Sequence, residues 1–337
     1  MATVLTSGAR AVTPPVPRTL PALVRPGELA RPALRSEVAA GRLAAVGRSA
    51  CVVVDPQLPV WQRRERLHLA RVRADHEALT GEHHFARESA ALLYGWPVWR
   101  CPDAPIILRT SSPGARAASG RRWSYAALDV DDGFVHTARC EHPDCEGHDL
   151  PVTARARTAA DCARLLRPLD ALVVVDGALR DGVQANDLLA RVAAMRGARG
   201  VRQARALIPF ADALAESAGE SWVRWLAVAH GLPRPHLQQP VDTATGTFWL
   251  DGYWPQVRVG WEYDGLAKYG SSEDAVRRSL LAEKRRSVAV GDARITLLHF
   301  DTTDVAAPRR AVERLRAAIP SEHWGPPIPA LGPMRAH

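Results

Sequence analysis

The stretch FWLDGYWPQVRVGWEYDGLAKYG, residues Phe248 to Gly270, places acidic side chains within two runs that are otherwise apolar and aromatic. The short connection YWPQ between the runs predicts a hairpin of two antiparallel strands. An ionised carboxylate is seldom left among buried aromatic residues without a counter-charge or a metal ion. The stretch therefore predicts two paired strands with a positively charged partner at their acids.

Alternation along the second strand decides which of its side chains share a face. In VRVGWEYDG, the period of two sends Glu262 and Asp264 to one side of the strand and the aromatic residues to the other. Pairing with the preceding strand brings Asp251 close to both. Oxygen ligands of this kind suit Mg²⁺ or Mn²⁺. The pattern predicts a metal site formed by Asp251, Glu262 and Asp264 that could activate water for phosphodiester hydrolysis.

Other charged residues near this stretch could complete such a site. Glu220, on the predicted helix before the strands, could supply a fourth oxygen, and Lys268 or Lys284 could bring an ammonium group from downstream. The competing interpretation is structural. Asp264 would then belong to an Asp-Gly turn that ends the strand, and Glu262 would pair with a nearby arginine.

The composition indicates a folded protein with a polyanionic partner. The 337 residues are 47% hydrophobic, enough for two or three compact units, and the net charge of +8 favours DNA as the partner. Five cysteines are an odd number and indicate a reducing compartment. The start of the chain lacks a signal-peptide pattern, and no apolar run is long enough to cross a bilayer. We expect a cytoplasmic protein without a membrane partner, and the sequence leaves its oligomeric state open.

The N-terminal part resembles a winged helix in its order of elements. After a flexible leader at 1–19, residues 20–60 predict a short helix near 27–30, a second helix from 32 to 40, and a small hairpin. The second helix of such a module enters the major groove. The alternative is a small structural unit whose arginines are only solvated. The residues predicted to contact DNA are Arg31, Arg35, Arg42 and Arg48.

The rest of the chain predicts an α+β, multidomain protein. Residues 61–210 form a middle region that begins mixed, with strands at 106–108 and 134–136, and becomes mainly helical. Residues 211–320 predict the order helix, two strands, helix, strand, helix, which is a small α/β domain, and residues 321–337 form a tail.

A second metal candidate lies in the middle region. The segment CEHPDCEGH offers Cys140, His142, Cys145 and His148 as ligands for zinc. The spacing matches no common zinc finger, and a ligand two residues after the first is awkward for a knuckle turn. A solvated loop is therefore the preferred interpretation.

Several segments resemble a known family. ESAGESWVRWL, FWLDGYWPQVRVGWEYDGLAKYG and EKRRSVAVGDARITLLHF resemble the C-terminal domain of very-short-patch-repair-like and DUF559-type members of the PD-(D/E)XK nuclease superfamily. RPALRSEVAAGRLAAVGRSACVVV resembles the N-terminal winged-helix segment of AbiEi-family antitoxins. The resemblance covers most of the chain. In the last strand, His299 stands where the family usually has an arginine.

The resemblance implies a restriction-endonuclease-like domain and a role for each acid. Asp251 takes the place of the motif aspartate, Glu262 that of the second acid, and Glu220 that of the helix acid. Asp264 stands where the superfamily usually has lysine, so Lys268 would serve from a migrated position. The implied activity is Mg²⁺-dependent cleavage of DNA.

The same resemblance also implies an alternative without catalysis. A protein of the AbiEi type would bind its own promoter as the antitoxin of a toxin-antitoxin system. Its nuclease-like domain would then be a scaffold, and its partners would be DNA and a cognate toxin.

Overall fold

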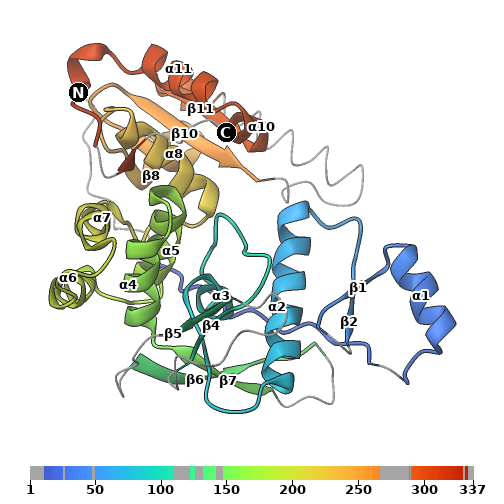
Figure 1. The fold of residues 1–337 in the computed structure, drawn as a ribbon. Helices are drawn as coiled ribbons and strands as arrows, with labels where there is room; N and C mark the ends of the chain where they lie inside the picture. Colours follow the sequence, from blue (N-terminus) through green and yellow to red (C-terminus); the bar gives the residue numbers. More distant parts are fainter. Residues whose placement is uncertain are drawn as a thin grey trace.

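The three-dimensional structure is a computed structural model. It describes residues 11–25, 27–47, 50–109, 122–125, 132–141, 147–265, 288, 290–328 and 331–332. In this part of the chain it is a mixed α/β protein with three separate β-sheets (Figure 1). Every helix within these residues is too short or too polar to span a bilayer.

The N-terminal module consists of α1 (Arg31–Ala39) and a two-stranded sheet of β1 (Leu43–Ala45) and β2 (Cys51–Val53). Helix α1 and the hairpin follow the prediction, with a proline in the first turn of the helix. The short helix predicted near 27–30 is wrong. This segment forms a turn in which Gly27 has φ of +104°, a conformation that a helix does not use.

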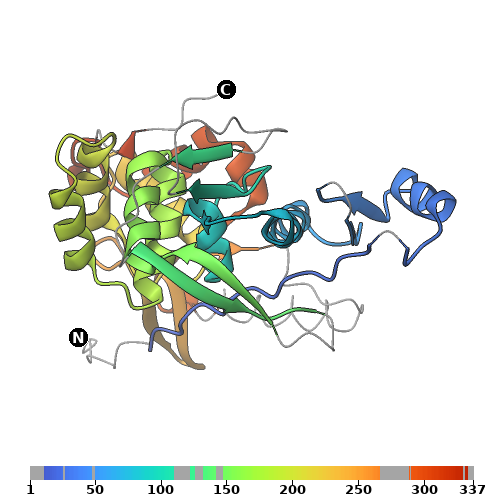
Figure 2. The same ribbon diagram turned by 60° about the horizontal axis from the view of Figure 1, so that its bottom comes forward.

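The hairpin of this module packs against α2 (Val60–Ala78) through a small apolar cluster that contains Val46, Val52 and Ala70. Helix α1 has no buried residue. The module therefore projects from the rest of the molecule and is anchored by its hairpin (Figure 2).

Residues 11–19, predicted as part of a flexible leader, lie extended along the body of the protein (Figure 2). Arg180 Nε donates to the carbonyl of Thr13 (2.6 Å), and Leu20 N donates to the carbonyl of Arg139 (2.7 Å). The carbonyl of Val16 lies directly against Gly95. The segment thus connects the middle region with the N-terminal module.

Gly95 gives a test of this docking, because it has φ of +82° and no room for a side chain beside Val16. We expect Gly95→Ala to lower the melting temperature and to make residues 11–19 sensitive to limited proteolysis. Gly182 has φ of +90° and open space around it. Gly182→Ala should introduce backbone strain alone, about 1–2 kcal/mol, and leave the segment protected. Equal protease sensitivity in both variants would contradict the docking.

The middle region contains a five-stranded sheet in the order β5-β4-β3-β7-β6. The strands predicted at 106–108 and 134–136 are confirmed as parts of β4 and β6. The strands are β3 (His84–Phe85), β4 (Ile106–Arg109), β5 (Arg122–Tyr125), β6 (Gly133–Ala138) and β7 (His148–Thr153). The helices are α3 (Arg87–Leu93), α4 (Arg155–Leu165), α5 (Pro168–Arg180), α6 (Ala185–Ala194) and α7 (Val201–Leu207), followed by the 3₁₀ turn η2 (Ile208–Phe210).

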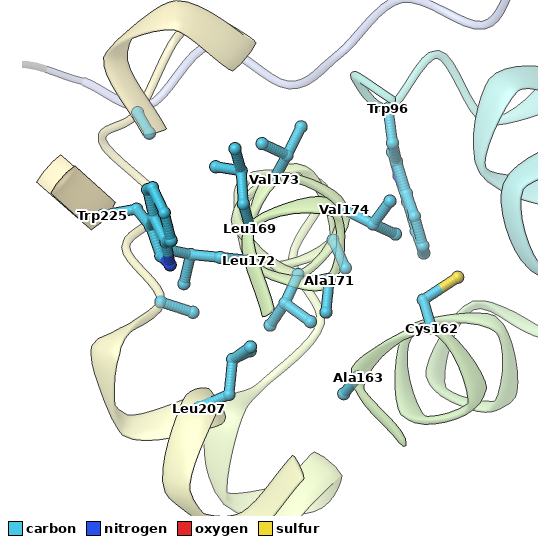
Figure 3. Close-up of a cluster of buried hydrophobic side chains, with 14 of the residues drawn as sticks. Trp96, Cys162, Ala163, Leu169, Ala171, Leu172, Val173, Val174, Leu207 and Trp225 are labelled. Carbon is cyan, nitrogen blue, oxygen red and sulfur yellow. The ribbon is translucent and has the colours of Figure 1, made fainter. Parts of the chain in front are cut away.

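Helix α5 is the centre of the hydrophobic core. It is apolar on nearly all sides, and nine of its residues are buried, as expected for a helix surrounded by others. Trp96, Cys162 and Leu207 approach it from neighbouring elements, and Trp225 approaches it from the C-terminal part (Figure 3). One continuous apolar core therefore joins the middle region to the C-terminal part.

The C-terminal part contains a four-stranded sheet in the order β11-β10-β9-β8. Strand β10 is antiparallel to β9 and parallel to β11. The two strands of the predicted hairpin and the last strand are confirmed, whereas β8 was not predicted. The elements are α8 (Ala218–Ala229), β8 (His236–Thr243), β9 (Gly246–Trp254), β10 (Val259–Asp264), β11 (Thr296–Asp301), α10 (Thr302–Ala306), α11 (Pro308–Ala318) and the 3₁₀ turn η4 (Ser321–His323). The helix predicted between the last two strands lies largely outside the described residues.

A buried ion pair reinforces the junction of α5 and α8. Arg224 and Asp176 form it, and each side chain is only 1% exposed. Asp176 also accepts hydrogen bonds from Ser221 Oγ (2.6 Å) and from Asp212 N (2.8 Å). These contacts fix α8, and with it the acid at its first turn, relative to the central helix.

Candidate functional site

The site is built where β9 and β10 stop pairing. Their ladder runs from the Val259–Trp254 pair to the Trp261–Gly252 pair. One residue further, the side chain of Asp251 replaces the backbone ladder, because its Oδ2 accepts from the N–H of Tyr263 (2.8 Å). Continued by one residue, this register brings Asp251 next to Glu262, but the described residues do not gather Asp251, Glu262 and Asp264 into a group of three metal ligands.

Strand β11 adds a histidine to this end of the sheet. Its parallel register places His299 beside Glu262 and Asp301 beside Asp264. His299 Nδ1 lies 3.3 Å from Oδ2 of Asp264. Glu262 is almost fully buried, with 3% of its surface exposed, whereas Asp264 is partly open to solvent. Asp264, which stands where the resemblance implies a lysine, therefore lies beside a histidine.

Helix α8 brings a fourth acid from the other direction. Ser217 caps the helix and accepts from the N–H of Glu220 (3.1 Å). Oε2 of Glu220 accepts from Glu216 N (2.9 Å) and from Gln238 Nε2 (3.2 Å). A methyl group on Gly219 would overlap the ring of Tyr263, so only glycine allows the helix to come this close to β10.

Gln238 is a site residue that the sequence did not reveal. It lies in β8 with φ of +47°, and the ladder between β8 and β9 skips it. The register of β8 with β9 is the same before and after Gln238, so its irregular backbone changes the direction of its side chain without inserting a residue. Here the irregularity directs the amide to Glu220. Nothing in the segment HLQQPVDT marks this residue for the role, so the missing signal was a backbone conformation.

The carboxylates Glu220 and Asp251 lie close enough to influence each other's ionisation. Burial raises the pKa of Glu220 to about 8, and the negative charge of Asp251 adds to the increase. A buried carboxylate beside another can share a proton or bind a cation. A cation at this pair would relieve the repulsion between the two carboxylates.

The described residues offer a cation two neighbouring carboxylates and not a cluster of three ligands. Among the residues that the structure describes, no group of three histidine, cysteine or acidic side chains is close enough together to hold an ion. Mg²⁺ often keeps several waters and binds through one or two carboxylates together with substrate phosphates. Glu220 and Asp251 offer such a pair. Lys268 lies outside the described residues.

The arginines of the N-terminal module differ in whether their guanidinium groups are free of an ion pair and so available to contact DNA. Arg31 and Arg35 are exposed on α1. Arg42 donates two hydrogen bonds to Glu37, at 2.6 and 2.7 Å, and this ion pair lowers the pKa of the Glu37 carboxyl. Arg48 lies outside the described residues. Of the four predicted DNA contacts, Arg31 and Arg35 are therefore the two whose guanidinium groups are exposed and without an ion pair in the described structure.

The zinc candidate is only partly described. Arg73 donates a hydrogen bond from a guanidinium nitrogen to Cys140 Sγ (3.0 Å). His148 starts β7. His142 and Cys145 lie outside the described residues.

Comparison with known proteins identifies relatives without a described activity. No family model matches the chain. The chain is 38% identical over 169 residues to two proteins of Mycobacterium tuberculosis, uncharacterized protein MT2308 of strain CDC 1551 / Oshkosh and uncharacterized protein Rv2248 of strain H37Rv. The match covers 50% of this chain and 59% of each relative, so the chain spans a little over half the length of these relatives.

Proposed function

We propose that the C-terminal part is a restriction-endonuclease-like domain of the PD-(D/E)XK type, and that the protein cleaves DNA in the presence of Mg²⁺. The observation that carries the proposal is that Glu220 on α8 lies close enough to Asp251 on β9 for the charge of Asp251 to raise its pKa, with Glu262 on the neighbouring strand β10. The net charge of +8 suits a polyanionic substrate.

The chain's own residues prepare this site for a phosphate. When bound, a divalent ion would lower the pKa of a water molecule and neutralise charge on the phosphoryl group. Asp251 and Glu220 would hold it, and each is already oriented by a hydrogen bond, from Tyr263 N and from Gln238 Nε2. Asp264 and His299, partly exposed beside them, would face the solvent side from which the phosphodiester arrives.

Cleavage of supercoiled plasmid tests the proposal. We expect the wild-type protein to nick plasmid with Mg²⁺ and not with a chelator, and Asp251→Asn and Glu262→Gln to lower the rate by at least about 100-fold. Asp242, an exposed acid on β8 of the same sheet, provides the matched control, and Asp242→Asn should cleave normally. Nicking that is unaffected by Asp251→Asn would remove the assignment.

A second candidate is a non-enzymatic regulator of the AbiEi antitoxin type. Two observations favour it: the described residues contain no three-ligand metal group, and α1 projects from the body with Arg31 and Arg35 exposed. Its DNA contacts would then come from α1, and its toxin partner would bind elsewhere. A promoter footprint that is lost in Arg35→Ala and retained in Asp251→Asn, without nicking by either, would support this candidate over the nuclease.

A further inference from the structure

The segment 188–211, from α6 to just beyond η2, contains five arginines and no acidic residue among its 24 positions. One of these arginines, Arg191, pairs with Asp132 inside the protein. The other four are exposed. We refer to these four as the α6–α7 corner: Arg196, Arg199, Arg202 and Arg205.

The arginines of the α6–α7 corner differ from the arginines of the described protein that pair with a carboxylate. In the described part of the protein, none of the ion pairs involves them, whereas many arginines elsewhere have an acidic partner. Arg157, for example, pairs with both Asp132 and Asp161. The corner therefore presents four exposed positive charges that no ion pair of the described residues neutralises.

The backbone that carries these arginines is held firmly against α4. Gly200 has φ of +81° and lies against the carbonyl of Arg164, where no other residue would fit. Gln203 Nε2 donates to the carbonyls of Ala163 (3.0 Å) and Leu166 (2.7 Å), and thereby caps the end of α4. The charges thus stand on a rigid surface, which reduces the entropy lost on binding a ligand.

We propose that the α6–α7 corner binds the phosphate backbone of DNA, as a contact surface separate from α1. The inference rests on the proposed function in taking DNA as the partner. Guanidinium groups bind phosphate oxygens in a bidentate manner. Arg202 and Arg205 are three residues apart on α7, so they point to the same side. No large hydrophobic side chain of 188–211 is exposed, which disfavours insertion into a membrane.

The position of the corner has a consequence for the length of DNA that is engaged. Helices α6 and α7 lie at one end of the molecule and α1 lies at the other, in both views (Figures 1 and 2). DNA that contacts both surfaces must therefore run along the whole body of the protein or consist of two segments.

Salt-dependent binding to a fluorescently labelled duplex of mixed sequence, followed by anisotropy in the presence of a chelator, tests the inference. Each phosphate contact adds close to one to the slope of log K against log salt. In the variant with all four arginines of the corner changed to glutamine, the magnitude of this slope should be smaller by about 3 to 4 between about 50 and 200 mM salt. Its affinity at the lower salt concentration should fall at least about 10-fold.

A charge-matched pair of variants separates a local contact from a net-charge effect. Arg202→Gln/Arg205→Gln should lower the slope by about 2, while Arg309→Gln/Arg310→Gln, on the exposed side of α11, should leave it nearly unchanged. Circular dichroism establishes that both are folded. Equal losses in the two variants would overturn the inference.

The remaining outcomes distinguish this inference from the proposed function. Unchanged binding by the fourfold variant, together with normal plasmid nicking, would overturn the inference and leave the nuclease proposal intact. Corner-dependent binding by a protein that never nicks DNA would support the inference and remove the nuclease. Binding of the wild-type protein to anionic vesicles and not to duplex would overturn the inference.

Discussion

Replacing Asp176 by alanine is expected to lower the free energy of unfolding by about 3–5 kcal/mol, because it leaves the guanidinium of Arg224 charged in a dry interior. Both side chains are 1% exposed, and Ser221 and Asp212 would also lose their acceptor. Urea unfolding followed by tryptophan fluorescence and by circular dichroism measures the change. Coincidence of the two signals would justify treating the transition as two-state.

Two further variants test whether the loss of stability comes from the burial of the ion pair. Changing Asp176 to leucine together with Arg224 to methionine removes both charges and should recover part of the loss. Glu37→Gln breaks the exposed pair with Arg42 and should leave the urea midpoint nearly unchanged. If Asp176→Ala were as mild as Glu37→Gln, the pair would not be part of a closed core.

The ion pair also connects stability to the candidate site. Arg224 lies about one helical turn after Glu220 on α8, so the contact that anchors the helix to α5 also positions the acid. Because one apolar core extends through the middle and C-terminal parts, we expect the site and α5 to unfold together. This coupling joins regions that the sequence presents as separate domains.

The local sequence pattern was sufficient to predict the helices and strands that have strong periodicity or clear end signals. The alternation around Trp261 predicted β10, although Val259 to Glu262 are buried on both faces, and helix α1 was found from its proline and from the glycine that follows it. Strand β8 escaped prediction because HLQQPVDT has no alternation and contains Pro240. It is an edge strand, where a proline does not break a ladder on both sides.

The candidate site was predictable only to the extent that it depends on one hairpin. The position of Asp251 opposite Glu262 follows from strand pairing, which the sequence reveals. The burial of Glu220 does not follow from strand pairing. It depends on the absence of a side chain at Gly219 and on the irregular backbone of Gln238. The proximity of His299 to Asp264 depends on a parallel pairing across 35 residues of sequence. Long-range contacts of this kind leave no periodic signal.

Replacing Glu220 by glutamine is expected to stabilise the protein at neutral pH while it lowers the cleavage of DNA. Burial, reinforced by the charge of Asp251, raises the pKa of Glu220 to about 8 from an ordinary value near 4.5. The folded state therefore keeps a proton that the unfolded chain releases, at a cost of about 3 kcal/mol at pH 7. Glutamine avoids this cost and can still accept from Glu216 N.

The pH dependence identifies the cause of this stabilisation. Below about pH 4.5 the carboxyl is protonated in both states, so the variant and the wild-type protein should differ little. As the pH rises towards about 8 the wild-type protein loses stability relative to the variant, and above that value the difference becomes constant. Thermal unfolding across this range, without metal, measures the difference. A constant difference at all pH values would contradict the assignment of the cost to ionisation.

Asp251→Asn separates the two contributions to this shift. It removes the neighbouring charge and leaves Glu220 buried, and burial is the larger of the two causes. The variant should therefore show the same pH dependence with a smaller amplitude than Glu220→Gln, and its plasmid cleavage should be lost as well. A residue that lowers stability is typically kept for its function. If Glu220 served only the packing of the core, its replacement by glutamine would not lower the activity.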